Sequence, residues 1–155
     1  MKLLCLNENS NLACVLTDVR EGISIETQAE QCGAYSSAYY ATFPASDFDA
    51  ACYSFPSAFS LADGIVSFDL DTAKQIGDGI INQQSNEQAK ANLAGLSYDV
   101  YVAQCSIPAE QRIAKYQAAI DANNALAIET ENREQAVYAA STIQEVNAIV
   151  YPPKD

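Results

Sequence analysis

The chain has 155 residues, 49% of them hydrophobic, and 20 acidic against 8 basic residues give it a formal net charge of −12. It contains no histidine, which excludes Ser-His-Asp and Cys-His nucleophiles and histidine-ligated zinc. The acidic balance argues against binding to nucleic acid or to an anionic membrane surface, and no run of about 20 apolar residues could span a bilayer. We expect a globular protein that is not an enzyme and that carries no cofactor.

The first part of the chain, residues 1–68, is rich in Tyr, Phe, Ser and Cys and predicts a small β-containing module. The apolar start gives way to polar residues after Leu6, too early for a secretory signal, so we expect a strand there. Alternating or continuous apolar runs predict strands at residues 1–6, 12–19, 23–26 and 64–68. The turns are expected at Arg20-Glu21-Gly22, closing a hairpin, and at Ala62-Asp63-Gly64.

A Ser/Tyr-rich segment within this module contains Tyr35, Tyr39 and Tyr40. Two interpretations stay open: the rings fill the core of the module, or they form a contact surface, for which tyrosine is well suited. Neighbouring residues of a strand face opposite sides of the sheet, so Tyr39 and Tyr40 could divide these roles. After this segment, residues 47–53 predict a short helix capped by Ser46.

Several carboxylates, at Asp47, Asp49, Asp63, Asp69 and Asp71, raise the alternative of a calcium site. The spacing of an EF-hand is absent, and we favour solvated carboxylates and a helix cap. The five cysteines also predict no metal centre, because no CxxC pair occurs among Cys5, Cys14, Cys32, Cys52 and Cys105. We expect reduced, mostly buried thiols.

The second part, residues 69–155, is rich in Ala, Gln, Asn, Ile and Glu and predicts helices. Helices are expected at residues 69–81, 86–105 and 110–128, and another ends near Ala140. Thr142 and Glu145 form a capping box that opens a last short helix, which ends at Tyr151-Pro152-Pro153. The glycine pair Gly77 and Gly79 suggests close approach of another backbone.

Within this region Ile113, Tyr116 and Ile120 approximate a heptad seam, with Asn123 or Asn124 following it. One interpretation is association between copies of the chain through this seam. The other is an amphipathic helix packed on its own neighbours. The fold predicted for the whole chain is α+β, with a small β-rich N-terminal module followed by a mainly α-helical region that forms a hairpin or bundle.

Two sequence motifs together resemble small accessory proteins of tailed bacteriophages, which are often encoded beside tail-fibre genes. The first motif is Ile-Val-Ser-Phe-Asp-Leu-Asp-Thr-Ala-Lys-Gln-Ile at residues 65–76, and the second is Ala-Ser-Thr-Ile-Gln-Glu-Val-Asn-Ala-Ile-Val-Tyr-Pro-Pro at residues 140–153. The chain differs in having Gln, Asn and Ala where the family has Arg-rich helices, and Val146 where Leu is common. The resemblance covers about residues 64–153 and implies a structural component of the virion.

The function expected from these observations is a structural subunit of a phage particle, associated with the tail, a fibre or the baseplate and assembled in the host cytoplasm. Its partners would be other phage structural proteins and copies of itself, with no nucleic acid and no membrane. The candidate contact residues are Tyr35, Tyr39, Tyr40, Ile113, Tyr116 and Ile120. The alternatives are a soluble acidic adaptor or inhibitor that binds a basic protein, and a calcium-dependent binding module.

Overall fold

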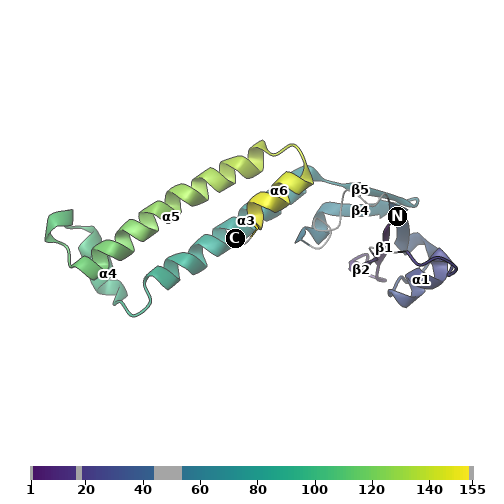
Figure 1. The fold of residues 1–155 in the computed structure, drawn as a ribbon, viewed down its shortest axis with the longest axis horizontal. Coiled ribbons are helices and arrows are strands. Elements are labelled where there is room, and N and C mark those ends of the chain that lie inside the picture. Colours follow the sequence, from purple (N-terminus) through teal and green to yellow (C-terminus); the bar gives the residue numbers. More distant parts are fainter. Residues whose placement is uncertain (1, 17–18, 44–53, 154–155) are drawn as a thin grey trace. The chain divides into compact units, whose positions relative to one another are not determined.

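The computed structural model describes residues 2–16, 19–43 and 54–153. The chain divides into two compact units, the N-terminal unit with residues 1–77 and 140–155, and a second unit, residues 78–139, here called the arm. The boundary lies inside helix α3 (Leu70–Asn92), rather than at residue 68, and the last helix belongs to the N-terminal unit (Figure 1). The predicted α+β class, β-rich first and mainly helical afterwards, is confirmed.

The N-terminal unit contains two small antiparallel sheets. Strands β1 (Lys2–Leu6), β2 (Leu12–Leu16) and β3 (Tyr40–Phe43) form one sheet in the order β2-β1-β3, and β4 (Phe59–Ala62) pairs with β5 (Ile65–Phe68) in the other. The β4–β5 turn places Asp63 and Gly64 at φ angles of 52° and 75°. Two consecutive residues with positive φ are what a tight hairpin turn requires, which explains the predicted turn at this position.

The central strand β1 is buried on both of its faces. Leu3 and Cys5 pack with Ala29 of helix α1 (Ile25–Gln31), whereas Leu4 and Leu6 pack with Val15 and with side chains of the β4–β5 hairpin. Burial on both faces explains why the strand reads as a continuous apolar run rather than an alternating one. Strand β2 has a bulge opposite the Cys5–Leu6 step of β1, because Cys5 pairs with Cys14 but Leu6 pairs with Leu12. The bulge places Leu12 beside the cluster that contains Leu6.

The strand predicted at residues 23–26 is wrong, because this segment begins helix α1. The Ser24 hydroxyl accepts a hydrogen bond from the Thr27 backbone N–H at 3.1 Å and caps the helix. The buried Gln28 amide then accepts from the Arg20 N–H at 2.8 Å and donates to the Ile23 carbonyl at 2.8 Å. A four-residue alternation was too short to outweigh these capping interactions.

Other elements of the N-terminal unit include two short 3₁₀ turns, Ser37–Tyr39 and Pro56–Ala58. The helix predicted at residues 47–53 lies outside the described residues. The last helix, α6 (Ile143–Val150), begins with the predicted capping box between Thr142 and Glu145, and ends before Tyr151-Pro152-Pro153. Its Asn147 Oδ1 accepts a hydrogen bond from Ser54 Oγ at 2.7 Å, which ties the last helix to the residues preceding β4.

The arm contains the rest of α3, the short helix α4 (Tyr98–Cys105), a 3₁₀ turn (Ala109–Gln111) and helix α5 (Ala114–Ala139). The predicted continuous helix through residues 86–105 is interrupted at residues 93–97, where Gly95 has a φ of 76°. Glycine adopts that conformation at no steric cost, so it ends α3 and lets the chain turn into α4. The helix predicted at residues 110–128 begins at Ala114 and continues to Ala139.

Hydrogen bonds between polar side chains link the antiparallel helices α3 and α5 along the arm. The four pairs are Asn82–Glu134 at 2.7 Å, Gln84–Arg133 at 2.8 Å, Ser85–Thr130 at 2.8 Å and Asn92–Asn123 at 2.9 Å. The buried apolar side chains of the arm, all of whose residues are described, are Ile81, Tyr116, Ala119, Ile120 and Val137. Polar pairing therefore sets much of the register between the two helices.

Candidate functional site

The three tyrosines predicted as contact residues lie around β3. Tyr39 packs in the cluster of Leu4, and Tyr40 packs in the cluster of Leu3, so the adjacent rings occupy opposite faces of the sheet as predicted. Tyr35 is exposed, and its ring meets that of Tyr39 edge-on at 5.7 Å between centroids. Tyr35 is therefore the member of this group that is most available to a partner.

A small hollow beside Tyr35 combines carboxylates with aromatic rings. It lies between α1 and the segment that leads into β3, and it is lined by Glu26, Glu30, Ala34, Tyr35, Ser36, Ser37 and Tyr40. Negative charge beside tyrosine faces suits a cationic side chain such as Lys or Arg. The sequence alone does not reveal that the two glutamates lie near the tyrosines, because that proximity depends on the helical conformation of residues 25–31.

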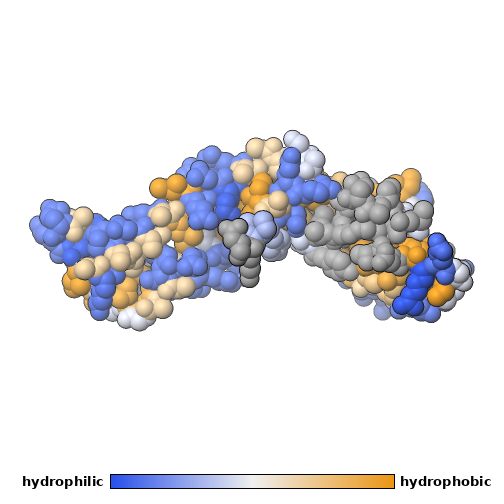
Figure 2. All heavy atoms as spheres, in the orientation of Figure 1, coloured by the Kyte–Doolittle hydropathy of each residue, from blue (hydrophilic) through white to orange (hydrophobic). Residues whose placement is uncertain are grey.

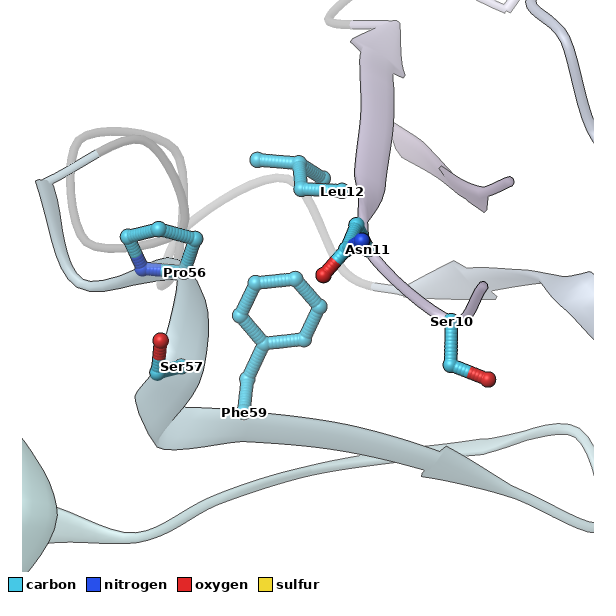
Figure 3. A pocket seen from close by; sticks show the side chains of 6 residues that line it. All are labelled: Ser10, Asn11, Leu12, Pro56, Ser57 and Phe59. Carbon is cyan, nitrogen blue, oxygen red and sulfur yellow. The ribbon is translucent and has the colours of Figure 1, made fainter. Parts of the chain in front are cut away.

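A second hollow in the N-terminal unit has no ionisable side chain among the described residues that line it. Figure 3 shows the Phe59 ring pointing from β4 toward Leu12 and Asn11, with Pro56 and Ser57 on its other side. The lining is completed by Ser10. The amide, hydroxyl and apolar groups of these six residues supply neither a general base nor an activated nucleophile.

Helix α4 carries the most distinctive surface of the arm. None of its eight residues is buried, although its composition is mainly apolar. Tyr98, Val102 and Cys105 follow one another at helical spacing on one face, here called the α4 face, and Tyr98 and Val102 are 67% and 48% exposed. The sequence contains this spacing, but which residues of α4 are exposed depends on how the helix packs in the arm.

The side of α4 that carries Tyr101 and Gln104 is attached to α5 and the turn before it. The Tyr101 hydroxyl accepts a hydrogen bond from Asn123 Nδ2 at 3.1 Å, and Gln104 Oε1 accepts from the Ile113 N–H at 2.6 Å. These bonds hold α4 in one orientation. The α4 face is thus presented to solvent by a fixed helix, which lowers the entropic cost of binding a partner.

The predicted seam of Ile113, Tyr116 and Ile120 is divided between the interior and the surface. Tyr116 and Ile120 are only 4% and 5% exposed within the chain, whereas Ile113 is 51% exposed. The Tyr116 hydroxyl also accepts a hydrogen bond from the Ser97 N–H at 3.4 Å. Tyr116 and Ile120 therefore contribute to packing inside the arm, the second interpretation above, and a contact role for the group stays a prediction.

Two further features of the predicted association surface also differ from expectation. A Cβ atom placed on Gly79 would meet nothing within 4 Å, so this glycine does not mark close approach of another backbone within the chain. Asn123 is half-buried and bonded to Asn92 and Tyr101, so its polar groups are used inside the arm. On the face drawn in Figure 2, hydrophilic side chains cover most of the arm, with hydrophobic ones in separate groups.

Charge is distributed unevenly along the chain. Residues 88–120, which include α4, carry a net charge of +1, whereas the whole chain carries −12. The charged residues of this segment are Lys90, Asp99, Glu110, Arg112 and Lys115. Copies of the chain could approach one another at this segment without the repulsion that the rest of the sequence would impose.

The acidic residues considered for calcium do not assemble into a cluster in the part of the chain that is described. There, no group of three or more Cys, Asp or Glu side chains is placed to hold a metal ion. Asp69 instead caps α3, because its carboxylate accepts hydrogen bonds from the Thr72 hydroxyl at 2.7 Å and from the Asp71 N–H at 3.0 Å. These bonds, chiefly those from Thr72, lower the pKa of Asp69. Asp47 and Asp49 lie outside the described residues.

Comparison with known proteins gives no relative: no family model, curated protein or solved structure matches this chain. Among the described residues, no helix is both long and apolar enough to cross a membrane.

Proposed function

We propose that this chain is a structural subunit of a bacteriophage particle, close to the tail, which connects a fibre or baseplate component to its neighbour. The phage context rests on the resemblance of residues 64–153 given above. The observation that carries the structural role is the α4 face, where Tyr98, Val102 and Cys105 lie exposed on a helix that hydrogen bonds hold in place.

An unpartnered apolar helix face supports a role in protein–protein contact. Full burial of a side chain such as Val contributes about 1.5–3 kcal/mol relative to exposure, so covering Tyr98 and Val102 would stabilise a complex by several kcal/mol. Tyrosine is also among the residues most enriched in the centres of interfaces. Because few apolar side chains are buried in the arm itself, a partner would also stabilise the two long helices.

The occupant that we propose for the α4 face is the same face of a second copy. The net charge of +1 in residues 88–120 permits two such segments to meet, whereas a contact between more acidic parts of two chains would be opposed by repulsion. An isologous contact of this kind closes into a dimer. Its main contribution is apolar, so salt should affect it little.

The test is the native mass of the purified chain by light scattering, at low and high salt, for the wild type and two matched variants. Val102→Asp places a carboxylate on the α4 face, and Val100→Asp makes the same change on the opposite side of the same helix. We expect a salt-resistant dimer for the wild type and Val100→Asp, and a monomer for Val102→Asp. A wild-type monomer at both salt concentrations would refute self-association through α4.

A second candidate function, an acidic adaptor or inhibitor for a basic protein, is favoured by the hollow around Tyr35. Glu26 and Glu30 would pair with Lys or Arg of the partner beside the tyrosine rings. Binding of an arginine-rich peptide should then weaken steeply with salt and with Glu26→Gln, while Glu21→Gln, outside the hollow, should have little effect. Binding that is equal in the two variants would count against this function.

A further inference from the structure

Three cysteines that are far apart in the sequence lie together in the N-terminal unit. Cys5 of β1 is directly opposite Cys14 of β2 in the strand pairing, and Cys32 follows the last turn of α1. All three belong to the apolar cluster formed by Leu3 and Ala29. The sequence predicted reduced, mostly buried thiols but not their proximity, because that depends on the sheet register and on α1.

The three side chains interact with one another and differ in their access to solvent. Cys14 and Cys32 both pack against the buried residues Leu3, Cys5 and Ala29, and Cys32 is a neighbouring thiol that raises the pKa of both Cys5 and Cys14. Cys5 is fully buried, whereas Cys14 and Cys32 are half-buried. An external reagent therefore reaches Cys14 and Cys32 but not Cys5.

Burial and the neighbouring thiols keep Cys5 and Cys14 protonated at neutral pH. Burial first, then the neighbouring thiols, raises the pKa of Cys5 to about 12 and that of Cys14 to about 11. Metal ions bind thiolates, so this environment does not favour a metal. Neighbouring thiols can still form a disulfide when one of them loses its proton and a small disulfide accepts the two electrons, and the protein disulfide carries no charge to bury.

We propose that Cys14 and Cys32 are a redox site, and that a low-molecular-weight disulfide converts them to an intramolecular disulfide bond. Both side chains pack against the same buried cluster, a Cβ atom on Gly33 would lie 3.9 Å from Ala13 Cβ, and both thiols are partly exposed. Cys5 remains reduced because no external reagent reaches it and because its pKa of about 12 leaves very little thiolate to attack a mixed disulfide on Cys14 or Cys32. The bond would join β2 to the end of α1, which the observed fold brings together.

The reaction is an exchange between thiols and a disulfide. The thiolate of one cysteine attacks the small disulfide, forming a mixed disulfide and releasing one small thiolate. The thiolate of the other cysteine then attacks the protein sulfur of the mixed disulfide, which forms the Cys14–Cys32 bond and releases the second small thiolate. Two protein thiols are oxidised, one small disulfide is reduced to two thiols, and the two protons pass to the released thiolates.

The environment of Cys14 makes the rate of this reaction depend on pH. Cys14 must lose its proton whether it attacks first or second, and its pKa is about 11. Below that pKa its thiolate fraction rises about tenfold per pH unit. The disulfide should therefore form slowly at neutral pH and markedly faster in mildly alkaline solution. Once formed it closes the loop of residues 14–32, which restricts the unfolded chain and raises the unfolding temperature.

The experiment treats the full-length chain with oxidised glutathione and identifies linked peptides by mass spectrometry. We expect a Cys14–Cys32 linkage in the wild type and in Cys105→Ser, which removes the exposed thiol that could join two chains. Cys32→Ser should abolish the linkage. Cys5→Ala should retain it, and alkylation after unfolding of the oxidised wild type should recover Cys5 as a free thiol even if that variant does not fold.

The unfolding temperature supplies an independent measurement. The oxidised wild type should unfold several degrees higher than the reduced protein, and a reducing agent should reverse the shift. The proposal would be overturned if Cys14 and Cys32 remained free after Cys105 had reacted completely. It would equally be overturned by a linkage of either residue to Cys5 or Cys52, or by an unfolding temperature that fell on oxidation.

Discussion

Asn123 provides a direct measure of how much the polar side chains stabilise the arm. In the structure this half-buried residue accepts a hydrogen bond from Asn92 Nδ2 at 2.9 Å and donates one to the Tyr101 hydroxyl at 3.1 Å. It therefore links α5 to both α3 and α4. The substitution Asn123→Ala removes both bonds, and Asn124→Ala makes the same chemical change at the adjacent, exposed position.

The expected magnitude follows from two opposing terms. Each neutral hydrogen bond contributes a net value of about 0.5–1.5 kcal/mol. Replacing Asn by Ala within a helix returns up to about 0.7 kcal/mol through helix propensity. The propensity term is shared by both variants, so the difference between their unfolding free energies reports the hydrogen bonds. Since Asn123 keeps some contact with water, we expect a difference of about 1–2 kcal/mol.

The assay is urea denaturation followed by far-ultraviolet circular dichroism, at one fixed protein concentration because association would shift the apparent stability. Asn124→Ala should be as stable as the wild type or slightly more stable, and Asn123→Ala should be less stable. Equal midpoints for the two variants would show that the bonds to Asn92 and Tyr101 do not stabilise the arm, and would refute polar pairing as the basis of its register.

Three further changes test the N-terminal unit. Thr142→Ala removes the capping hydroxyl of α6 and should lower the unfolding free energy by about 1 kcal/mol in a urea titration. Leu4→Ala in the fully buried centre of β1 should cost about 2–5 kcal/mol, whereas Ile65→Ala, on the exposed side of β5, should cost far less; similar losses would contradict the burial described here. Asp69 has a lowered pKa when folded, so its contribution is present above its unfolded pKa and lost as pH falls through its folded pKa. Thermal melts from about pH 5 to pH 2 should therefore show a smaller loss of stability for Asp69→Asn than for the wild type.

Short-range signals were sufficient for several elements. The capping box of Thr142 and Glu145, the cap at Asp69 and the turn at Gly64 each depend on residues within four positions of one another, and all three are present in the structure. The strand expected at residues 23–26 was also predicted from a short-range pattern, and that prediction is wrong. A brief alternation competed there with the Ser24 cap, and the longer helix that buries Ala29 was favoured.

The residues of the candidate site depend more on contacts between distant segments, which a local sequence pattern does not predict. Heptad spacing made Ile120 a contact candidate, yet hydrophobic periodicity only predicts that a residue is covered, by its own chain or by another. In the structure Ile120 is buried within the arm, while Val102 on α4 is exposed. Likewise, the spacing of Cys14 and Cys32 resembles no known motif, and only the register of β1 with β2 and the position of α1 bring them together.

The sequence by itself determined the α+β class, the hairpin turn before residue 65, the last helix, and the exclusion of histidine chemistry. These features follow from composition and from interactions between near neighbours, which are the same in any tertiary context. Tertiary structure decided which apolar residues are covered, which polar residues pair between α3 and α5, and which thiols meet. Burial and pairing depend on segments that are distant in the sequence. They stabilise the protein only after those segments have been brought into contact.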